Sequence, residues 1–184
     1  MSVGRFSGSI DDMRRDQMEH ILRAAAAVTN EREFVVIGSQ ALLAALPDLP
    51  PPLNQSMELD LYPLTNPAAG DLIDGTIGEL SPFDETFGYY GHGVAPETAI
   101  LPEDWRDRAI TVENSNTGGA RGICIGPADV AISKLAAGRD KDLSFVRAMI
   151  DLGIVSIEVL LQLVDRLEDV HRIPVHKRLV AFES

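Results

Sequence analysis

The chain has 184 residues, of which 45% are hydrophobic and 24% are charged, and this suits one compact domain or one domain with a helical extension. Its 28 acidic and 16 basic side chains give a formal net charge of −12, which argues against a general binder of nucleic acids or of anionic membranes. Cys124 is the one cysteine, so an internal disulfide and a multi-cysteine zinc site are excluded. The N-terminal segment shows no signal peptide and no apolar stretch of membrane-spanning length, so we expect a cytoplasmic protein.

The first quarter of the chain predicts a helix, a buried strand and a second, short helix. Residues 9–12 have the sequence of a capping box, and apolar residues at helical spacing follow to about Asn30. Residues 34–37 are four consecutive apolar residues, which predict a buried strand closed by Gly38 and Ser39. Residues 40–46 predict a short helix, and the prolines of residues 47–52 predict a stiff loop after it.

The middle of the chain predicts short strands and one more helix. Apolar and polar residues alternate over residues 56–62, which predicts a strand with two different faces. Residues 68–78 favour a helix, and residues 87–99 favour a strand and a turn. Residues 109–113 and 121–125 predict two further strands separated by a turn rich in Asn, Ser and Gly.

The last third of the chain has helical periodicity. It predicts helices over residues 128–137 and 140–152 and a third that starts near Ser156, while Pro174 breaks the tail, which we leave unassigned. We therefore expect an α+β fold, in which a mixed sheet flanked by helices occupies residues 1–126 and a helical region, residues 127–184, packs on it.

Glu58 and Asp60 are the first candidates for chemistry. In a strand they project from the same face, roughly 6.5 Å apart along the chain. Two carboxylates that close repel each other unless one is protonated or a cation lies between them, and oxygen ligands of this kind favour Mg²⁺ or Mn²⁺. The alternative, and the commoner outcome for an isolated pair of this kind, is an ordinary acidic strand edge facing solvent.

Gly38 and Ser39 are the second candidates. Glycine lets a phosphate approach the backbone, and a helix that starts at this point offers free N–H groups, to which Ser39 adds a hydroxyl donor. A strand followed by such a turn and a helix is common, so this feature alone indicates no more than a tight turn.

The two features together match the signature of the nucleotidyltransferase superfamily that includes DNA polymerase β: a hydrophobic run, Gly-Gly or Gly-Ser, a helix, and a strand bearing two acids one residue apart. The chain resembles minimal members of that superfamily, which include the AbiEii- and MenT-type toxins of bacterial toxin–antitoxin systems. It is most similar to a family of uncharacterised bacterial nucleotidyltransferase-like proteins. The blocks that carry this resemblance are residues 36–41, 56–63, 81–90 and 133–142.

The resemblance implies a nucleotidyltransferase-like sheet and a role for each candidate. Gly38 and Ser39 would hold the phosphates of a nucleoside triphosphate, and Glu58 and Asp60 would bind the divalent ions that bridge those phosphates and activate the attacking hydroxyl. Related proteins often have a third carboxylate on a neighbouring strand. Its position here stays open; Glu113 has the best pattern, and Glu85 and Glu97 are weaker choices.

Residues 134–142 concentrate positive charge in an acidic chain. Spacing alone favours solvated helix ends with weak ion pairs for Lys134, Arg139 and Lys141. The resemblance instead implies that Lys134 meets the triphosphate, with Arg139 and Lys141 nearby and Asp142 orienting one of them. Lys134 and Asp142 are therefore candidate catalytic residues, and Arg139 and Lys141 are candidate nucleotide-binding residues.

Residues 89–92 are a further candidate for ligand binding. Residues 89–92 read Tyr-Tyr-Gly-His and could stack a base or a sugar, although aromatic residues beside glycine more often serve packing.

The resulting hypothesis is an enzyme that transfers a nucleotide from a nucleoside triphosphate to a hydroxyl, on an RNA end or a protein side chain, with Mg²⁺ or Mn²⁺. The alternative is a degenerate fold that binds nucleotide or a cognate antitoxin without catalysis. Two departures from the usual signature favour this alternative: 18 residues separate Ser39 from Glu58, and the first acid is Glu rather than Asp.

Overall fold

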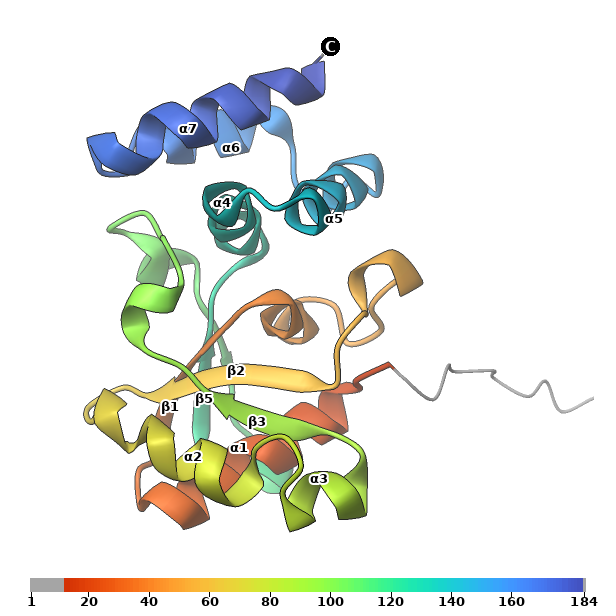
Figure 1. Ribbon diagram of the computed structural model, residues 1–184, viewed down its shortest axis with the longest axis vertical. Helices are drawn as coiled ribbons and strands as arrows, with labels where there is room; N and C mark the ends of the chain where they lie inside the picture. Colours follow the sequence, from red (N-terminus) through yellow and green to blue (C-terminus); the bar gives the residue numbers. More distant parts are fainter. Residues whose placement is uncertain (1–11, 184) are drawn as a thin grey trace, which may run out of the picture.

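The computed structural model describes residues 12–183 (Figure 1). The capping box expected at residues 9–12 begins outside these residues. The first helix, α1 (Arg15–Thr29), starts later than predicted, and the backbone N–H of Arg14 donates a hydrogen bond of 2.8 Å to the Gln17 side chain at its start. Met18, Ile21 and Leu22, on the predicted apolar face, are fully buried.

A five-stranded mixed sheet forms the centre of the fold. Its strands are β1 (Glu33–Ile37), β2 (Glu58–Pro63), β3 (Tyr90–Gly93), β4 (Ile110–Val112) and β5 (Arg121–Cys124). Their order across the sheet is β3-β2-β1-β5-β4. The central strand β1 runs antiparallel to β2 and parallel to β5, β2 is parallel to β3, and β4 is antiparallel to β5. With the helices described below, this sheet confirms the predicted α+β class.

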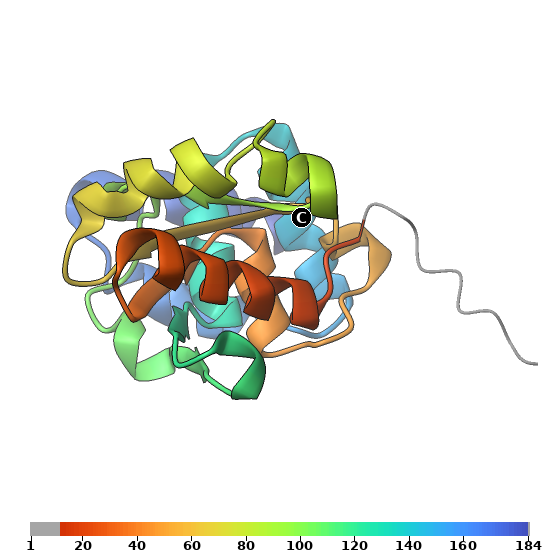
Figure 2. The ribbon, with the colours of Figure 1, turned by 90° about the horizontal axis from the view of Figure 1, so that it is seen from below.

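Three helices lie on one side of the sheet. Helices α1 and α2 (Gly70–Ile77) pack against each other beneath β2 and β3, as Figure 2 shows from that side. Helix α3 (Pro82–Phe87) directly precedes β3 and was not predicted, although the Ser81 hydroxyl caps it by accepting a hydrogen bond from the Asp84 backbone N–H. This signal, Ser-Pro followed by acidic residues, is typical of a helix start.

The opposite side of the sheet carries the C-terminal helices (Figure 1). The short helix expected over residues 40–46 is the 3₁₀ helix η1 (Ser39–Ala44), which packs between the sheet and α4 (Pro127–Ala137). Helices α5 (Asp140–Asp151), α6 (Ile157–Val164) and α7 (Asp169–Val180) pack around α4. Gly38 therefore leads into a short 3₁₀ turn, whose dipole is small compared with that of a full α-helix.

Pro174 does not break the tail, because α7 runs through it. The proline removes one backbone donor, but Val175 and Leu179 of the same helix are fully buried against α4 and α6. Tertiary packing of this apolar face outweighs the lost hydrogen bond.

The hydrophobic core is continuous through the described part of the chain. Gly126, the expected boundary, is the N-cap of α4, and fully buried side chains on its two sides, such as Leu42 and Leu135, belong to one cluster. Among residues 12–183, no helix is both long enough and apolar enough to cross a membrane.

Candidate active site

The two carboxylates of β2 lie beside the glycine turn that ends β1. Asp60 pairs with Ile37 across the β1–β2 ladder, so Gly38 is next to the Asp60 side chain. Gly38 has φ +74°, and a Cβ at this position would overlap Oδ2 of Asp60. The glycine is thus required both by its backbone conformation and by the closeness of the carboxylate.

Two residues of β3 face the same carboxylates. In the parallel β2–β3 register, Tyr90 lies beside Glu58 and His92 lies beside Asp60. The Tyr90 hydroxyl donates a hydrogen bond of 3.0 Å to Oε2 of Glu58. Nδ1 of His92 is hydrogen-bonded to Oδ1 of Asp60 at 2.8 Å and lies 3.5 Å from Oε1 of Glu58.

Burial and the charges of this cluster shift the pKa values of Asp60 and His92. Burial, and next the negative charge of Glu58, raise the pKa of Asp60 to about 6. Burial lowers the pKa of His92, but the hydrogen bond to Asp60 and the charges of Asp60 and Glu58 outweigh it, so that the pKa of His92 is raised. The cluster therefore favours any species that brings positive charge between the two carboxylates.

The basic segment predicted at residues 134–142 folds around one buried acid. The Asp142 side chain is only 1% exposed, and Arg139 donates two hydrogen bonds to it, of 2.6 and 3.2 Å. Nζ of Lys134 lies 3.4 Å from Oδ1 of Asp142 and 5.1 Å from the centre of the Phe145 ring. Burial raises the pKa of Asp142, but the two cations together lower it by more than burial raises it. The pKa of Asp142 is therefore below its usual value.

The turn between α4 and α5 makes this arrangement possible. Gly138 ends α4 in the left-handed region at φ +67°, and Arg139 is the N-cap of α5. The last turn of α4 and the first turn of α5 thereby bring Lys134 and Asp142 together.

The acidic and basic groups line a shared pair of cavities. One, of about 250 Å³, is lined by seven of the predicted site residues: Ser39, Glu58, Asp60, Lys134, Arg139, Lys141 and Asp142. The other, of about 240 Å³, has four of these in its wall together with Gly38. All eight residues singled out from the sequence are therefore brought to one place, with carboxylates and cations around the same space.

None of the three candidates for a third carboxylate reaches this place. Glu113 accepts a hydrogen bond of 2.9 Å from Arg121, which also pairs with Glu33 at the start of β1. Since β4 runs antiparallel to β5, its Ile110 end lies beside Cys124 and its other end, next to Glu113, lies at the far end of the sheet. Among the described residues, the possible metal ligands around Glu58 and Asp60 include His92 and neither Glu85 nor Glu97.

Sequence reasoning missed the roles of Tyr90 and His92 at this cluster. The sequence contains one relevant pattern. Tyr90 and His92 are separated by one residue, Gly91, just as Glu58 and Asp60 are separated by Leu59, so each pair lies on one face of its strand. That pattern does not say which strands are neighbours, and the pairing of β3 with β2 is what brings the four side chains together.

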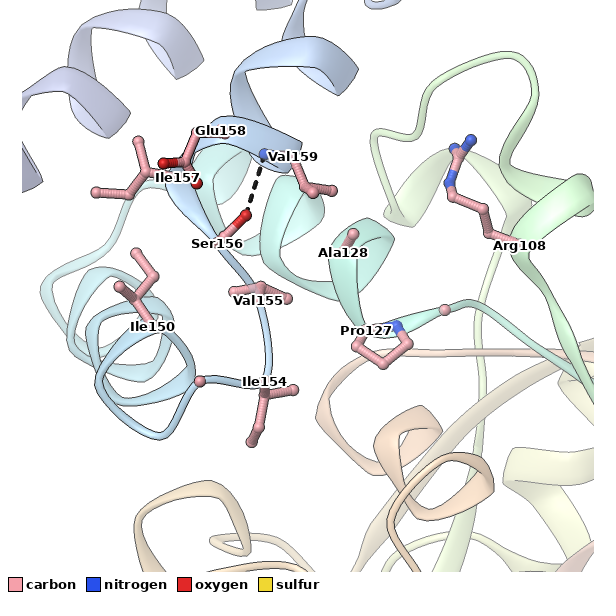
Figure 3. A pocket seen from close by; sticks show the side chains of 12 residues that line it. Arg108, Pro127, Ala128, Ile150, Ile154, Val155, Ser156, Ile157, Glu158 and Val159 are labelled. Atoms are coloured by element: carbon pink, nitrogen blue, oxygen red, sulfur yellow. Dashed lines mark hydrogen bonds between the residues drawn. The ribbon is translucent and has the colours of Figure 1, made fainter.

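A larger cavity, of about 770 Å³, lies elsewhere, between the start of α4 and the start of α6 (Figure 3). Ile150, Ile154 and Val155 give it an apolar wall, and the Ser156 hydroxyl accepts a hydrogen bond from Val159 N–H at the start of α6. It contains none of the predicted site residues, so we assign it no part in phosphate chemistry.

Comparison with known proteins decides the family. A sequence model described as "nucleotidyltransferase of unknown function (DUF6036)" matches residues 16–183. The chain belongs to this nucleotidyltransferase family. No curated protein and no solved structure gave a match. The DUF6036 match extends from α1 through α7, so it includes both the sheet and the C-terminal helices, and membership implies a nucleoside triphosphate as substrate.

Proposed function

We propose that this DUF6036 chain transfers a nucleotide from a nucleoside triphosphate to a hydroxyl group, with Mg²⁺ or Mn²⁺ held between Glu58 and Asp60. The observation that carries the proposal is the cavity in which these two acids share the lining with Lys134, Arg139 and Lys141. A triphosphate that chelates a divalent cation needs carboxylates for the cation and basic side chains for the phosphates, both within the length of the triphosphate.

The donor set fits such an ion. A carboxylate oxygen of Glu58 and one of Asp60 lie within 4.8 Å of each other. The ion supplies charge neutralisation on the phosphates and lowers the pKa of the attacking hydroxyl. Burial and the negative charge of Glu58 raise the pKa of Asp60 to about 6, so a cation between the two carboxylates would stabilise the charged form of Asp60.

The basic residues hold the other end of the triphosphate. Asp142 forms ion pairs with Lys134 and Arg139 and so holds both side chains in position. Their other N–H groups can then donate hydrogen bonds to phosphate oxygens. Gly38 keeps side-chain bulk away from the phosphates, and the Ser39 hydroxyl lies in the same wall as the acids. In the reaction the hydroxyl oxygen bonds to the α-phosphorus and its proton passes to solvent water, while pyrophosphate leaves with the electron pair of the broken P–O bond.

The acceptor is an RNA end or a protein side chain. The net charge of −12 disfavours a long track for nucleic acid, so an RNA would contact the protein near its end only. Incubation of the chain with each labelled triphosphate, Mg²⁺, and RNA and protein extracts tests the proposal and identifies the acceptor class. Label that appears with the wild type and disappears with Glu58→Ala supports it; a triphosphate that binds without any labelled acceptor would favour nucleotide binding without catalysis.

The resemblance to AbiEii- and MenT-type toxins supports a further part of the proposal, namely a toxin that has a cognate antitoxin. Its test is expression of the chain in a bacterium. Growth arrest that Asp60→Ala relieves supports a toxic nucleotidyltransferase, and unchanged growth at high expression of the wild type contradicts it.

A further inference from the structure

The carboxylate pair on β2 has a third potential ligand that is not an acid. Nδ1 of His92 lies 2.8 Å from Oδ1 of Asp60 and 3.5 Å from Oε1 of Glu58. Donors at adjacent corners of an octahedron around a small divalent cation are about 3 Å apart, given bond lengths of roughly 2.1 Å. The two distances from Nδ1 are thus close to the spacing of adjacent donors in a coordination octahedron.

We propose that His92 is a third metal ligand of this site and that it makes the site favour Mn²⁺ over Mg²⁺. This inference rests on the proposed function, because it takes the Glu58 and Asp60 pair as metal-binding. It adds a ligand and a preference that follow from the chemistry of imidazole: Mg²⁺ prefers oxygen donors, whereas nitrogen donors suit transition metals.

Tyr90 occupies one carboxylate oxygen of Glu58 and leaves the other oxygen available to the ion. The Tyr90 hydroxyl donates to Oε2 of Glu58, and it is the other oxygen, Oε1, that faces His92. A hydrogen bond to the distal oxygen of a ligating carboxylate is the usual way in which a protein orients such a ligand.

The backbone around His92 is held firmly. A Cβ on Gly91 would lie 3.1 Å from Ile73 and 3.2 Å from Ile21, so β3 packs closely on α2 and α1. The backbone N–H of Gly93 donates a hydrogen bond of 2.7 Å to Oδ1 of Asp74 in α2. His92 therefore projects from a fixed point toward Asp60, and its side chain, 46% exposed, leaves room for water or phosphate oxygens to complete the coordination.

The alternative is that His92 only donates a hydrogen bond to Asp60 and does not bind the ion. Electron spin-echo modulation of bound Mn²⁺ separates the two roles, since a directly coordinated imidazole nitrogen modulates the echo and a nitrogen outside the coordination sphere does not do so with comparable depth. The measurement needs no acceptor and no turnover.

The experiment uses the full chain with Mn²⁺ alone, and then with Mn²⁺ and a non-hydrolysable triphosphate. Nitrogen modulation is expected in the wild type and in His171→Gln, whose histidine lines the adjoining cavity, but not in His92→Gln. Mn²⁺ affinity should fall about tenfold in His92→Gln. His92→Asp restores a third carboxylate and should recover Mn²⁺ binding without the nitrogen signal, while the preference for Mn²⁺ over Mg²⁺ decreases.

The outcomes distinguish this inference from the proposed function. Bound Mn²⁺ without nitrogen modulation in the wild type overturns the role of His92 as a ligand and leaves the carboxylate site intact. Modulation that persists in His92→Gln also overturns it. If the folded wild type binds no Mn²⁺ even with the triphosphate, both the ligand assignment and the metal-dependent function are wrong.

Discussion

Gly38 and Asp60 occupy mutually dependent positions, because the carboxylate of Asp60 fills the space that any side chain at position 38 would need. The pairing of Ile37 with Asp60 across the ladder fixes this closeness. The glycine of the proposed phosphate-binding turn and the acid of the proposed metal site are therefore parts of one local structure.

Gly38→Ala tests that dependence. The alanine must adopt φ near +74° and also displace Asp60, so we expect triphosphate binding to fall by about tenfold or more, and stability to fall by about 1–2 kcal/mol. Gly88→Ala is the matched control, because Gly88 has φ +73° with no atom within 4 Å of the added Cβ. Titration calorimetry and urea unfolding measure the two effects. Equal losses of triphosphate binding in both variants would contradict the dependence.

Asp60→Asn tests the cost of burying the charged Asp60 carboxylate beside Glu58. The folded pKa of Asp60, about 6, is above its unfolded value of 3.8, so the folded state holds its proton more tightly and wild-type stability falls as pH rises through this window. In a chelator solution without metal, Asp60→Asn should therefore be more stable than the wild type by about 2 kcal/mol above the window, and no more stable below it.

Urea unfolding of both proteins across the window measures the difference. Added Mn²⁺ should stabilise the wild type and have little effect on Asp60→Asn. A stability difference that does not depend on pH would contradict the raised pKa of Asp60.

Asp142→Asn tests the anchor of the basic residues. Because the pKa of Asp142 is lowered in the fold, the carboxylate contributes stability above its unfolded pKa and loses that contribution as pH falls through the folded value. At neutral pH we expect a loss of about 1–2 kcal/mol together with weaker triphosphate binding, as Lys134 and Arg139 lose their shared partner. Asp140→Asn, at an exposed position of the same helix, should leave stability and triphosphate binding nearly unchanged; similar losses in both variants would count against the anchor.

Glu113→Gln tests the correction of the third carboxylate. Glu113 pairs with Arg121 at the far end of the sheet, so metal and triphosphate affinities should stay within about twofold of the wild type. His92→Gln is the comparison, with the loss of Mn²⁺ affinity stated above. A larger loss for Glu113→Gln than for His92→Gln would reverse the assignment.

Local patterns predicted the strand that carries the site. The alternation over residues 56–62 places Glu58 and Asp60 on one face of β2, as found, and the apolar run before Gly38 is β1. Both are local properties, since a strand has a period of two and a buried central strand is apolar throughout. The gathering of residues 134–142 at the acids followed from family resemblance, because spacing alone favoured isolated ion pairs.

What the sequence did not reveal depends on contacts between distant segments. The register of β3 against β2, which brings His92 to Asp60, joins residues 32 positions apart. The short helix after Gly38 takes the 3₁₀ form and packs on α4, and Pro174 is tolerated because the apolar face of α7 is buried. In each case packing outweighs local preference.

Transfer of label from the α-phosphate tests nucleotidyl transfer most directly. The chain is incubated with Mn²⁺ or Mg²⁺, a cell extract, and the same triphosphate labelled in parallel at the α- or the γ-phosphate, with Asp60→Asn as the matched control. We expect acceptor labelling from the α-label alone, and its loss in Asp60→Asn. Labelling from the γ-phosphate, or α-labelling that Asp60→Asn retains, would contradict nucleotidyl transfer at the Glu58 and Asp60 site.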